Sequence, residues 1–423
     1  MITLIEALNY KSLRYIRRPL SNFHILVGPN ASGKTTFLDV IAFMSELVSN
    51  GLESALDKRS RNFQDLVWKG RGNRFEIAIE AKIPLAIADR LSKKGKAFDI
   101  IRYELAIGTE KDSDTVEILE ERVLLKVSKL VEHVQRELFP SMPEMASTLM
   151  STKGTKNTIT IVNKVRDGND YFKTELYKGQ SKSKGWQYAF KLGSQKSSLG
   201  NIPTDEEQFP ATTWLKNLLT EGVQTFILNS LLIRRASPPG QKRGFNPDGS
   251  NLPWVIEDLS KQNSPRFGEW ISHIRTALPD IENIRTIERE DDRHRYLLIK
   301  YKNGLEVPSW TVSDGTLRLL ALTLPAYIPD LKGIYLIEEP ENGIHPKAVE
   351  TVFQSLSSVY DAQILMASHS PVILGISKPE DILCFAKTKD GSTDIVSGDH
   401  HPALAKWQGE TNLGVLFAAG VLG

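Results

Sequence analysis

A glycine-rich segment near the N-terminus constrains the fold of this chain more than any other feature of its sequence. The segment matches G-x-x-x-x-G-K-[ST] without a gap and consists of Gly28, Pro29, Asn30, Ala31, Ser32, Gly33, Lys34 and Thr35. The short apolar run Phe23 to Val27 precedes it, and apolar residues recur near helical spacing from Lys34 onward. A buried strand, a phosphate-wrapping loop and a helix in this order predict an α/β fold with a parallel core sheet.

The chemistry that this segment predicts is phosphate binding. Its glycines let backbone N–H groups point inward around a phosphate, and the helix N-terminus that follows adds positive charge. Lys34 is placed to contact the β- and γ-phosphates, the Thr35 hydroxyl is placed to contact Mg²⁺, and Thr36 follows as a further nucleotide contact. We therefore expect ATP and Mg²⁺ as cofactors. An ordinary glycine-rich turn is the alternative, and it rarely falls between an apolar strand and an amphipathic helix.

Paired acids follow a second apolar run, Ile334 to Ile337. In a parallel sheet this position puts carboxylates beside the phosphate loop. Glu338 would then hold the Mg²⁺ shell, often through water, and Glu339 would position and deprotonate the attacking water. The alternative is a strand that simply continues into a charged loop.

Two further segments complete the candidate site. His369 follows a third predicted strand, Gln363 to Ala367, where it could contact the γ-phosphate, although a histidine after a strand is often structural. Ser313 and Gly315 open a predicted helix that continues from Thr316 to Thr323, and such an N-terminus binds anions. Helix capping by Ser313 or Asp314 is the simpler interpretation, and both interpretations can hold together.

The order of the four motifs, GPNASGKT, SDGT, LIEEPENGIHP and ASHSP, resembles the ABC-type ATPase superfamily. Within it the chain is most similar to the SMC/RecF/OLD branch, over residues 1–50 and 305–385. This resemblance implies a head-to-tail homodimer, or a higher oligomer, with two ATP molecules between the heads. It also implies that Ser313 and Gly315 contact the γ-phosphate bound to the other subunit. Asn342, Gly343 and His345 would lie across the same interface, and Gln64 is a candidate for the Q-loop glutamine.

The resemblance implies an ABC-type P-loop NTPase head, a parallel core sheet plus an antiparallel β subdomain, with a helical lobe and a mixed insertion. We expect the ATPase core to be assembled from both chain ends, 1–74 and 300–423. Residues 75–200 would form the antiparallel subdomain with an irregular insertion, and 201–299 a mainly helical lobe that leads to the SDGT segment, which corresponds by resemblance to the signature motif of the superfamily. Partly alternating polar and apolar residues predict strands at 75–80, 99–107, 115–119 and 158–162. We also expect a helix at 126–138, an exposed and mobile segment at 179–185, and a hairpin turn at Asn303–Gly304.

Composition favours a cytoplasmic protein without a membrane span. The chain has 423 residues, a formal net charge of +2 and one cysteine, Cys384, which we expect to be a small core residue. No apolar stretch approaches the length of a membrane-spanning helix. Local basic clusters favour a solvated surface when each is taken alone, but their number leaves contact with double-stranded DNA open. They are Arg14, Arg17 and Arg18; Lys58, Arg59 and Arg61; Lys69, Arg71 and Arg74; Arg234 and Arg235; and Lys242 and Arg243.

The chemistry that the sequence indicates is ATP turnover. No coiled-coil arm, zinc site or acidic Toprim cluster is evident, so we expect no nuclease activity in this chain. The leading hypothesis is a switch in a bacterial antiphage defence module that controls a separately encoded effector, such as a Toprim-like nuclease. The alternatives are a RecF-like ATPase that clamps duplex DNA, and a scaffold that binds ATP and barely hydrolyses it. Residues 409–423 also resemble the tail of compact ATPases found beside antiphage effectors, and they would either dock on the chain's own core or contact a partner.

Overall fold

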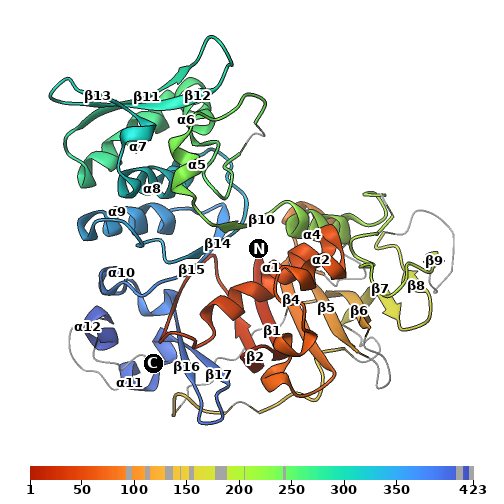
Figure 1. Cartoon of the computed structure of the whole chain (residues 1–423). Coiled ribbons are helices and arrows are strands. Elements are labelled where there is room, and N and C mark those ends of the chain that lie inside the picture. Colours follow the sequence, from red (N-terminus) through yellow and green to blue (C-terminus); the bar gives the residue numbers. More distant parts are fainter. Residues whose placement is uncertain are drawn as a thin grey trace.

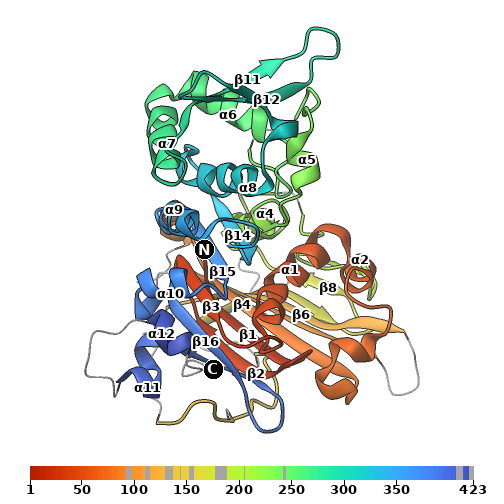
Figure 2. The same cartoon turned by 60° about the vertical axis from the view of Figure 1, so that its left-hand side comes forward.

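The structure is a computed structural model. It describes residues 1–91, 98–109, 115–128, 137–142, 144–151, 157–176, 188–203, 205–241, 244–405 and 413–418. In these residues the chain forms three β-sheets, of six, eight and three strands. Figures 1 and 2 show the smallest sheet and its helices as a lobe at one end of the molecule, with the eight-stranded sheet toward the other end.

The six-stranded sheet carries the phosphate loop. Its order is β10 (Val223–Phe226), β14 (Gly333–Glu338), β15 (Ala362–Ala367), β3 (Phe23–Val27), β16 (Ile382–Lys387) and β17 (Thr393–Ser397). The first five strands are parallel, and β17 pairs antiparallel with β16. Neighbours in this order come from distant parts of the chain, so the sheet brings the N-terminal loop beside strands of the C-terminal third.

The eight-stranded sheet is antiparallel throughout. Its order is β2 (Leu13–Pro19), β1 (Ile2–Tyr10), β4 (Arg74–Lys82), β5 (Ile100–Thr109), β6 (Val116–Lys126), β7 (Thr158–Val165), β8 (Asp170–Phe172) and β9 (Tyr188–Phe190). The strands expected at 75–80, 99–107, 115–119 and 158–162 all belong to it, and they run longer than the sequence pattern indicated.

Helix α1 (Lys34–Asn50) packs between these two sheets. Its buried face, which includes Phe37, Ile41 and Met44, shares one hydrophobic core with the antiparallel sheet and with Leu26 of β3. The neighbouring residue Ile25 points the other way, into a second core. This alternation follows from the period of two in a strand, and it explains why the parallel strands read as continuous apolar runs.

The second core lies between the other face of the parallel sheet and a set of helices that continues into the lobe. The lobe contains α5 (Ser230–Arg234), α6 (Leu252–Gln262), α7 (Ser264–Ala277), α8 (Asp314–Thr323) and the antiparallel strands β11 (Ile281–Glu288), β12 (Arg295–Tyr301) and β13 (Glu306–Pro308). The remaining helices are α2 (Leu52–Asp57), α3 (Leu85–Leu91), α4 (Pro210–Thr220), α9 (Pro346–Ser357), α10 (Pro371–Ile376), α11 (Pro402–Ala405) and α12 (Leu413–Ala418). Short 3₁₀ turns cover Phe63–Leu66, Trp68–Gly70, Ser309–Thr311, Leu324–Tyr327, Pro379–Asp381 and Gly398–His400.

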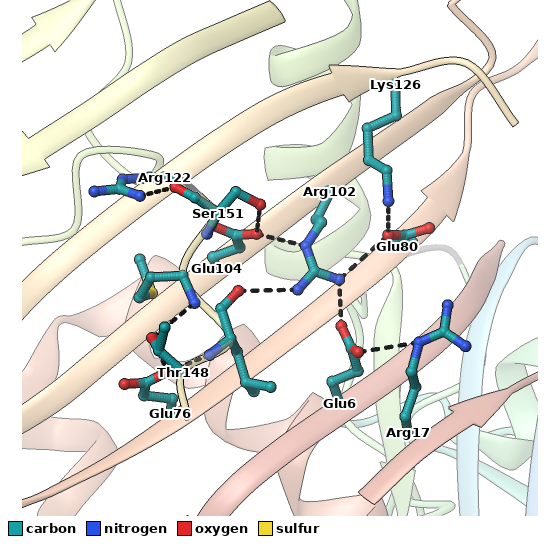
Figure 3. Close-up of polar contacts among 12 residues, drawn as sticks. Glu6, Arg17, Glu76, Glu80, Arg102, Glu104, Arg122, Lys126, Thr148 and Ser151 are labelled. Carbon is teal, nitrogen blue, oxygen red and sulfur yellow. Dashed lines mark hydrogen bonds and ion pairs between the residues drawn. The ribbon is translucent and has the colours of Figure 1, made fainter. Parts of the chain in front are cut away.

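A buried ionic network binds residues 148–151, the covering segment, to the antiparallel sheet (Figure 3). Arg102 of β5 pairs with Glu6, Glu80 and Glu104, which come from β1, β4 and β5. The covering segment is bound to the same network, because Arg102 donates to the carbonyl of Leu149 at 3.2 Å and Glu104 accepts from the Ser151 amide at 2.9 Å. Burying a charge costs free energy unless it is paired, so these contacts couple strand register to the position of the segment.

The structure departs from the expected organisation in several places. The helix expected at 126–138 falls largely on 129–136, outside the described residues, and its first residue Lys126 is instead the last residue of β6. The segment 179–185 also lies outside the described residues. Strand β10, from the stretch expected to be helical, joins the parallel sheet, and β1 and β2 join the antiparallel one. The division into three parts therefore stays a proposal, since both sheets cross its boundaries.

Several smaller expectations are met. Strands β12 and β13 form the hairpin expected at Asn303–Gly304, and Gly304 has the positive φ, 86°, that such a turn favours. Cys384 is fully buried. Helix α12 packs on α10 with Leu413 buried, which favours docking for the described part of the tail.

None of the helices in the described residues has the length and hydropathy needed to cross a membrane.

Candidate functional site

The phosphate loop lies between β3 and α1, and neither of its two glycines has room for a side chain. Gly28 has φ 149°, and a Cβ there would lie 2.2 Å from the Phe385 carbonyl oxygen. Gly33 has φ 106°, and a Cβ there would lie 2.3 Å from Thr393 Oγ1. Only glycine avoids both the backbone strain and the collision. The loop conformation is therefore set by strands β16 and β17, which pack against it.

Lys34 is held inside the curve of this loop. Its Nζ donates to the carbonyl oxygens of Gly28 at 2.8 Å and Pro29 at 3.0 Å. Burial lowers the pKa of Lys34 below its ordinary value, and the nearby carboxylates of Glu339 and Glu338 act in the opposite direction. A partly desolvated ammonium aimed along a ring of backbone groups is suited to an oxyanion ligand.

The parallel order of β14, β15 and β3 brings the other predicted residues to the same edge of the sheet. In the register, Glu338 pairs with Ala367, and Ala367 pairs with Leu26. The phosphate loop, the paired acids and His369 consequently meet at the carboxyl ends of adjacent strands, where ligands bind in open α/β sheets. A cavity of about 440 Å³ lies here, lined by Lys11, Ser12, Asn30, Ala31, Gly33, Lys34, Thr35, Thr36, Glu338, Glu339, Ala367, His369, Lys387 and Gly391.

Thr35 and Glu338 make direct contact across this cavity. Thr35 Oγ1 donates to Glu338 Oε2 at 2.7 Å. A hydroxyl and a carboxylate at this spacing form the hard oxygen pair that Mg²⁺ prefers, and Mg²⁺ in nucleotide sites takes its remaining ligands from phosphates and water. Among the described residues no group of three or more His, Cys, Asp or Glu side chains could hold a metal alone. The Thr35 hydroxyl and the Glu338 carboxylate fit a Mg²⁺ ion whose other ligands come from a bound nucleotide and water.

Glu339 has an unusual backbone conformation for its residue type. Its φ is 48°, in the left-handed region, and its backbone N–H donates to the Ala367 carbonyl at 2.8 Å. Its carboxylate accepts a short hydrogen bond from Asn342 Nδ2. Strained residues of this kind concentrate at functional sites, and Glu339 lines the cavity together with Lys34 and Thr35.

His369 is half-buried at the same cavity. Burial lowers the pKa of its imidazole below the ordinary value, the Lys34 charge lowers it further, and Glu339 and Glu341 raise it. The net lowering of the pKa favours the neutral form of the ring. Its backbone N–H donates to Glu341 Oε1 at 2.8 Å.

The signature residues lie apart from this cavity. Ser313 is the N-cap of α8, since its Oγ accepts from the Thr316 amide at 3.2 Å. Ser313 and Thr316 line a different cavity of about 710 Å³, beside the β12–β13 hairpin. Gly315 packs on the loop that follows the paired acids, and a Cβ at Gly315 would lie 2.6 Å from the Gly343 carbonyl oxygen. Helix capping by Ser313 is therefore confirmed, and the anion-binding role stays a prediction.

Several residues around the cavity carry no sequence motif. Lys11 and Ser12 come from the turn between β1 and β2, Lys387 is the last residue of β16, and Gly391 lies in the connection between β16 and β17. Single residues in turns have no periodicity, so sequence reasoning had no signal with which to find them. Glu341 stands within the quoted motif, but only the fold places it against His369.

Gln64 lies elsewhere. It lines a separate cavity of about 680 Å³ together with Arg61, Asn62 and Phe63. In the amide orientation that satisfies its hydrogen bonds, its nitrogen donates to the Gly70 carbonyl at 3.1 Å and to the Gly72 carbonyl at 3.3 Å. These contacts stabilise a local loop, and Gln64 is not among the residues that line the phosphate-loop cavity.

Most of the basic clusters contain a side chain that is paired with an acid. The pairs are Arg14–Asp390, Arg17–Glu6, Lys58–Glu46, Arg59–Asp39, Arg74–Glu76 and Arg234–Asp314. Lys69 lies over the ring of Trp68, 5.2 Å from its centroid. Lys242 and Arg243 are outside the described residues. Pairing of this kind favours a solvated, self-compensated surface for these clusters.

Comparison with known proteins shows the family of the chain. A family model described as "AAA domain, putative AbiEii toxin, Type IV TA system" matches residues 23–112 and 167–375, which is more than half of the chain. A curated relative, the Retron Vc95 probable ATPase of Vibrio cholerae serotype O1 biovar El Tor, is 21% identical over 404 residues, covering 90% of this chain and 72% of the relative.

Among solved structures, a crystal structure of an SMC head bound to the C-terminal winged-helix domain of ScpA is similar in fold. It aligns with a TM-score of 0.52 and 14% identity, covering 94% of this chain and 97% of that one. The chain has the fold of an ABC-type P-loop ATPase head, as the SMC/RecF/OLD resemblance implied, and it belongs to the family of AAA domains described as putative AbiEii toxins of type IV toxin–antitoxin systems.

Proposed function

We propose that the chain binds Mg²⁺–ATP and hydrolyses it between two copies of itself, as the switch of a bacterial defence module. One observation carries this proposal. The phosphate loop, Glu339 and His369 line one cavity, whereas Ser313 lines another in the lobe. A signature motif that contacts the γ-phosphate would then have to come from a second copy, which is the arrangement of a head-to-tail dimer.

The roles of the residues follow from their positions. Lys34 and the loop amides would bind the β- and γ-phosphates, and Thr35 with Glu338 would hold Mg²⁺, which supplies charge neutralisation on the phosphate oxygens. Glu339 would accept the proton of the attacking water as it adds to the γ-phosphorus and the bond to the ADP oxygen breaks. His369, with a neutral ring, would donate a hydrogen bond to a γ-phosphate oxygen. The products are ADP and inorganic phosphate.

The defence role is supported by the similar proteins. The curated relative is named as a retron ATPase, and the family description names a toxin–antitoxin system. An ATPase head of this kind fits a switch, in which ATP closes the dimer and hydrolysis opens it. A separately encoded effector would then bind to the closed dimer or be controlled by it.

The test combines turnover with oligomeric state in purified protein. Wild-type chain with Mg²⁺–ATP should release phosphate, and Glu339→Gln should bind ATP, hydrolyse it at a small fraction of that rate and double in mass by light scattering. Ser313→Arg should bind ATP yet stay at the lower mass. No ATP-dependent phosphate release by the wild type, or dimerisation that Ser313→Arg leaves intact, would contradict the proposal.

The effector is tested with the trapped form. Tagged Glu339→Gln should be captured from its native host with ATP, and Lys34→Ala serves as the matched control that cannot close. A stoichiometric protein that depends on closure and is encoded nearby supports the switch. Duplex DNA without such a protein would instead support a RecF-like clamp.

A further inference from the structure

A third carboxylate, Glu341, joins the loop of the paired acids to the loop of His369. Its Oε1 accepts two hydrogen bonds, from the His369 backbone N–H at 2.8 Å and from Ser368 Oγ at 2.8 Å. Ser368 Oγ in turn accepts from the Ser370 backbone N–H at 3.0 Å. One carboxylate oxygen therefore organises three consecutive residues around His369.

The other oxygen of this carboxylate is buried. Glu341 Oε2 has no hydrogen-bond partner among the described residues. A buried polar atom without a partner costs free energy, and such atoms are few in native structures. The Oε2 atom therefore contributes no bond of its own, and the contacts that Glu341 makes with residues 368–370 all pass through Oε1.

The position of Glu341 in the chain relates these contacts to the candidate site. It lies two residues after Glu339, whose strained backbone is itself bonded to Ala367 at the end of β15. It also lies two residues before Gly343, whose carbonyl packs against Gly315 of the signature helix. Glu341 thus lies where three segments meet: the loop that begins at Glu339, the loop of residues 368–370 and the start of α8.

We infer that Glu341 is a positioning residue, which sets the distance between the His369 imidazole and the Glu339 carboxylate. The inference rests on the proposed ATPase function, and Glu341 is not among the residues that line the nucleotide cavity. It acts through the backbone of residues 368–370. Losing it lets the His369 loop shift relative to the reacting atoms, and a misplacement of about 1 Å can cost about 100-fold in rate.

This role predicts that substitutions at Glu341 change the rate of ATP hydrolysis and not the affinity for ATP. Lys34 and Thr35 make their contacts without Glu341, so nucleotide affinity should be unaffected while the chemical step slows. Gln at position 341 keeps an acceptor at the Oε1 position, and Asp is one methylene too short to reach the His369 amide. The expected order of turnover is therefore wild type, then Gln, with Asp and Ala well below.

The experiment measures ATP turnover, nucleotide affinity and hydrogen exchange on the full chain. Glu341→Ala and Glu341→Asp should lower kcat about 10- to 100-fold and leave the Kd for ATP within about twofold. Glu341→Gln should stay within about threefold of wild type. Exchange of the amides at 368–370 should speed up in the Ala and Asp variants only. Glu350→Ala, an exposed carboxylate on α9, is the matched control and should leave all three readouts unchanged.

Each outcome decides the matter. Wild-type turnover in both Glu341→Ala and Glu341→Asp overturns the inference, as does a parallel loss of ATP affinity and turnover. Should Glu341→Ala fail to fold, the comparison of Glu341→Gln with Glu341→Asp carries the test. A lower kcat in Glu341→Gln than in Glu341→Asp would also overturn the inference. Hydrogen exchange separates this failure from that of the proposed function, because it reports the Glu341 contact even in a chain that hydrolyses nothing.

Discussion

The hydroxyl of Thr393 donates a 2.9 Å hydrogen bond to the backbone carbonyl of Ser32, 361 positions earlier in the sequence. Thr393 also lies 3.1 Å from Ser12 Oγ, in the turn between β1 and β2. Both Thr393 and Ser32 are buried. The first residue of β17 thus supports the phosphate loop from outside it.

Replacing Thr393 by Val should weaken nucleotide binding without unfolding the chain. Val keeps the volume and removes the donor, and a hydrogen bond of this kind contributes about 0.5–1.5 kcal/mol. The Kd for ATP should accordingly rise about 2- to 10-fold, as measured by titration calorimetry. Thr276→Val, at an exposed threonine of α7, is the control. An equal rise in the Kd for ATP in this control would show that the effect does not come from the support of the phosphate loop.

Lys34→Ala should abolish most nucleotide affinity. The ammonium is nearly buried and is aimed along the loop by the Gly28 and Pro29 carbonyls. A hydrogen bond to a charged group is worth about 1.5–3 kcal/mol, so the Kd for ATP should rise at least about 10-fold. Lys347→Ala, at an exposed lysine of α9, should bind as the wild type does, and unchanged affinity in Lys34→Ala would refute the assigned loop.

Gly315→Ala should impair dimer closure more than ATP binding. A Cβ at this position would lie 2.6 Å from the Gly343 carbonyl oxygen, so the start of α8 or the loop must move. ATP affinity of the single chain should change less than about twofold, within ordinary additivity for distant sites, while the ATP-dependent increase in mass is lost. In the control Gly268→Ala a Cβ meets nothing within 4 Å, and closure there should be normal.

Arg102→Ala should destabilise the antiparallel sheet and its covering segment. The guanidinium is buried among three carboxylates (Figure 3), and removing one partner of a buried ionic group typically costs about 3–5 kcal/mol. Arg17→Ala, which removes a half-exposed partner of Glu6, should cost about 0–1 kcal/mol. Thermal unfolding followed by circular dichroism compares the two, and equal melting temperatures would show that the network contributes nothing.

The sequence by itself determined the features that depend on contiguous residues. The strand, loop and helix from Phe23 onward, the paired acids after Ile337 and the hairpin at Asn303–Gly304 each follow from local spacing, because strand and helix periods and turn chemistry are short-range properties. Four motifs in one order were therefore enough to identify the fold of the head.

Tertiary structure alone decided which distant residues hold the motifs of the site in place. The support of Ser32 by Thr393 and the contact of Glu341 with His369 join residues that no periodicity relates. The pairing of β10 with β14 is of the same kind. Sheet order sets such contacts, and it depends on how the two cores pack on either side of the parallel sheet rather than on any local preference. The phosphate loop could be found in the sequence, but the groups that hold it in place could be seen only in the fold.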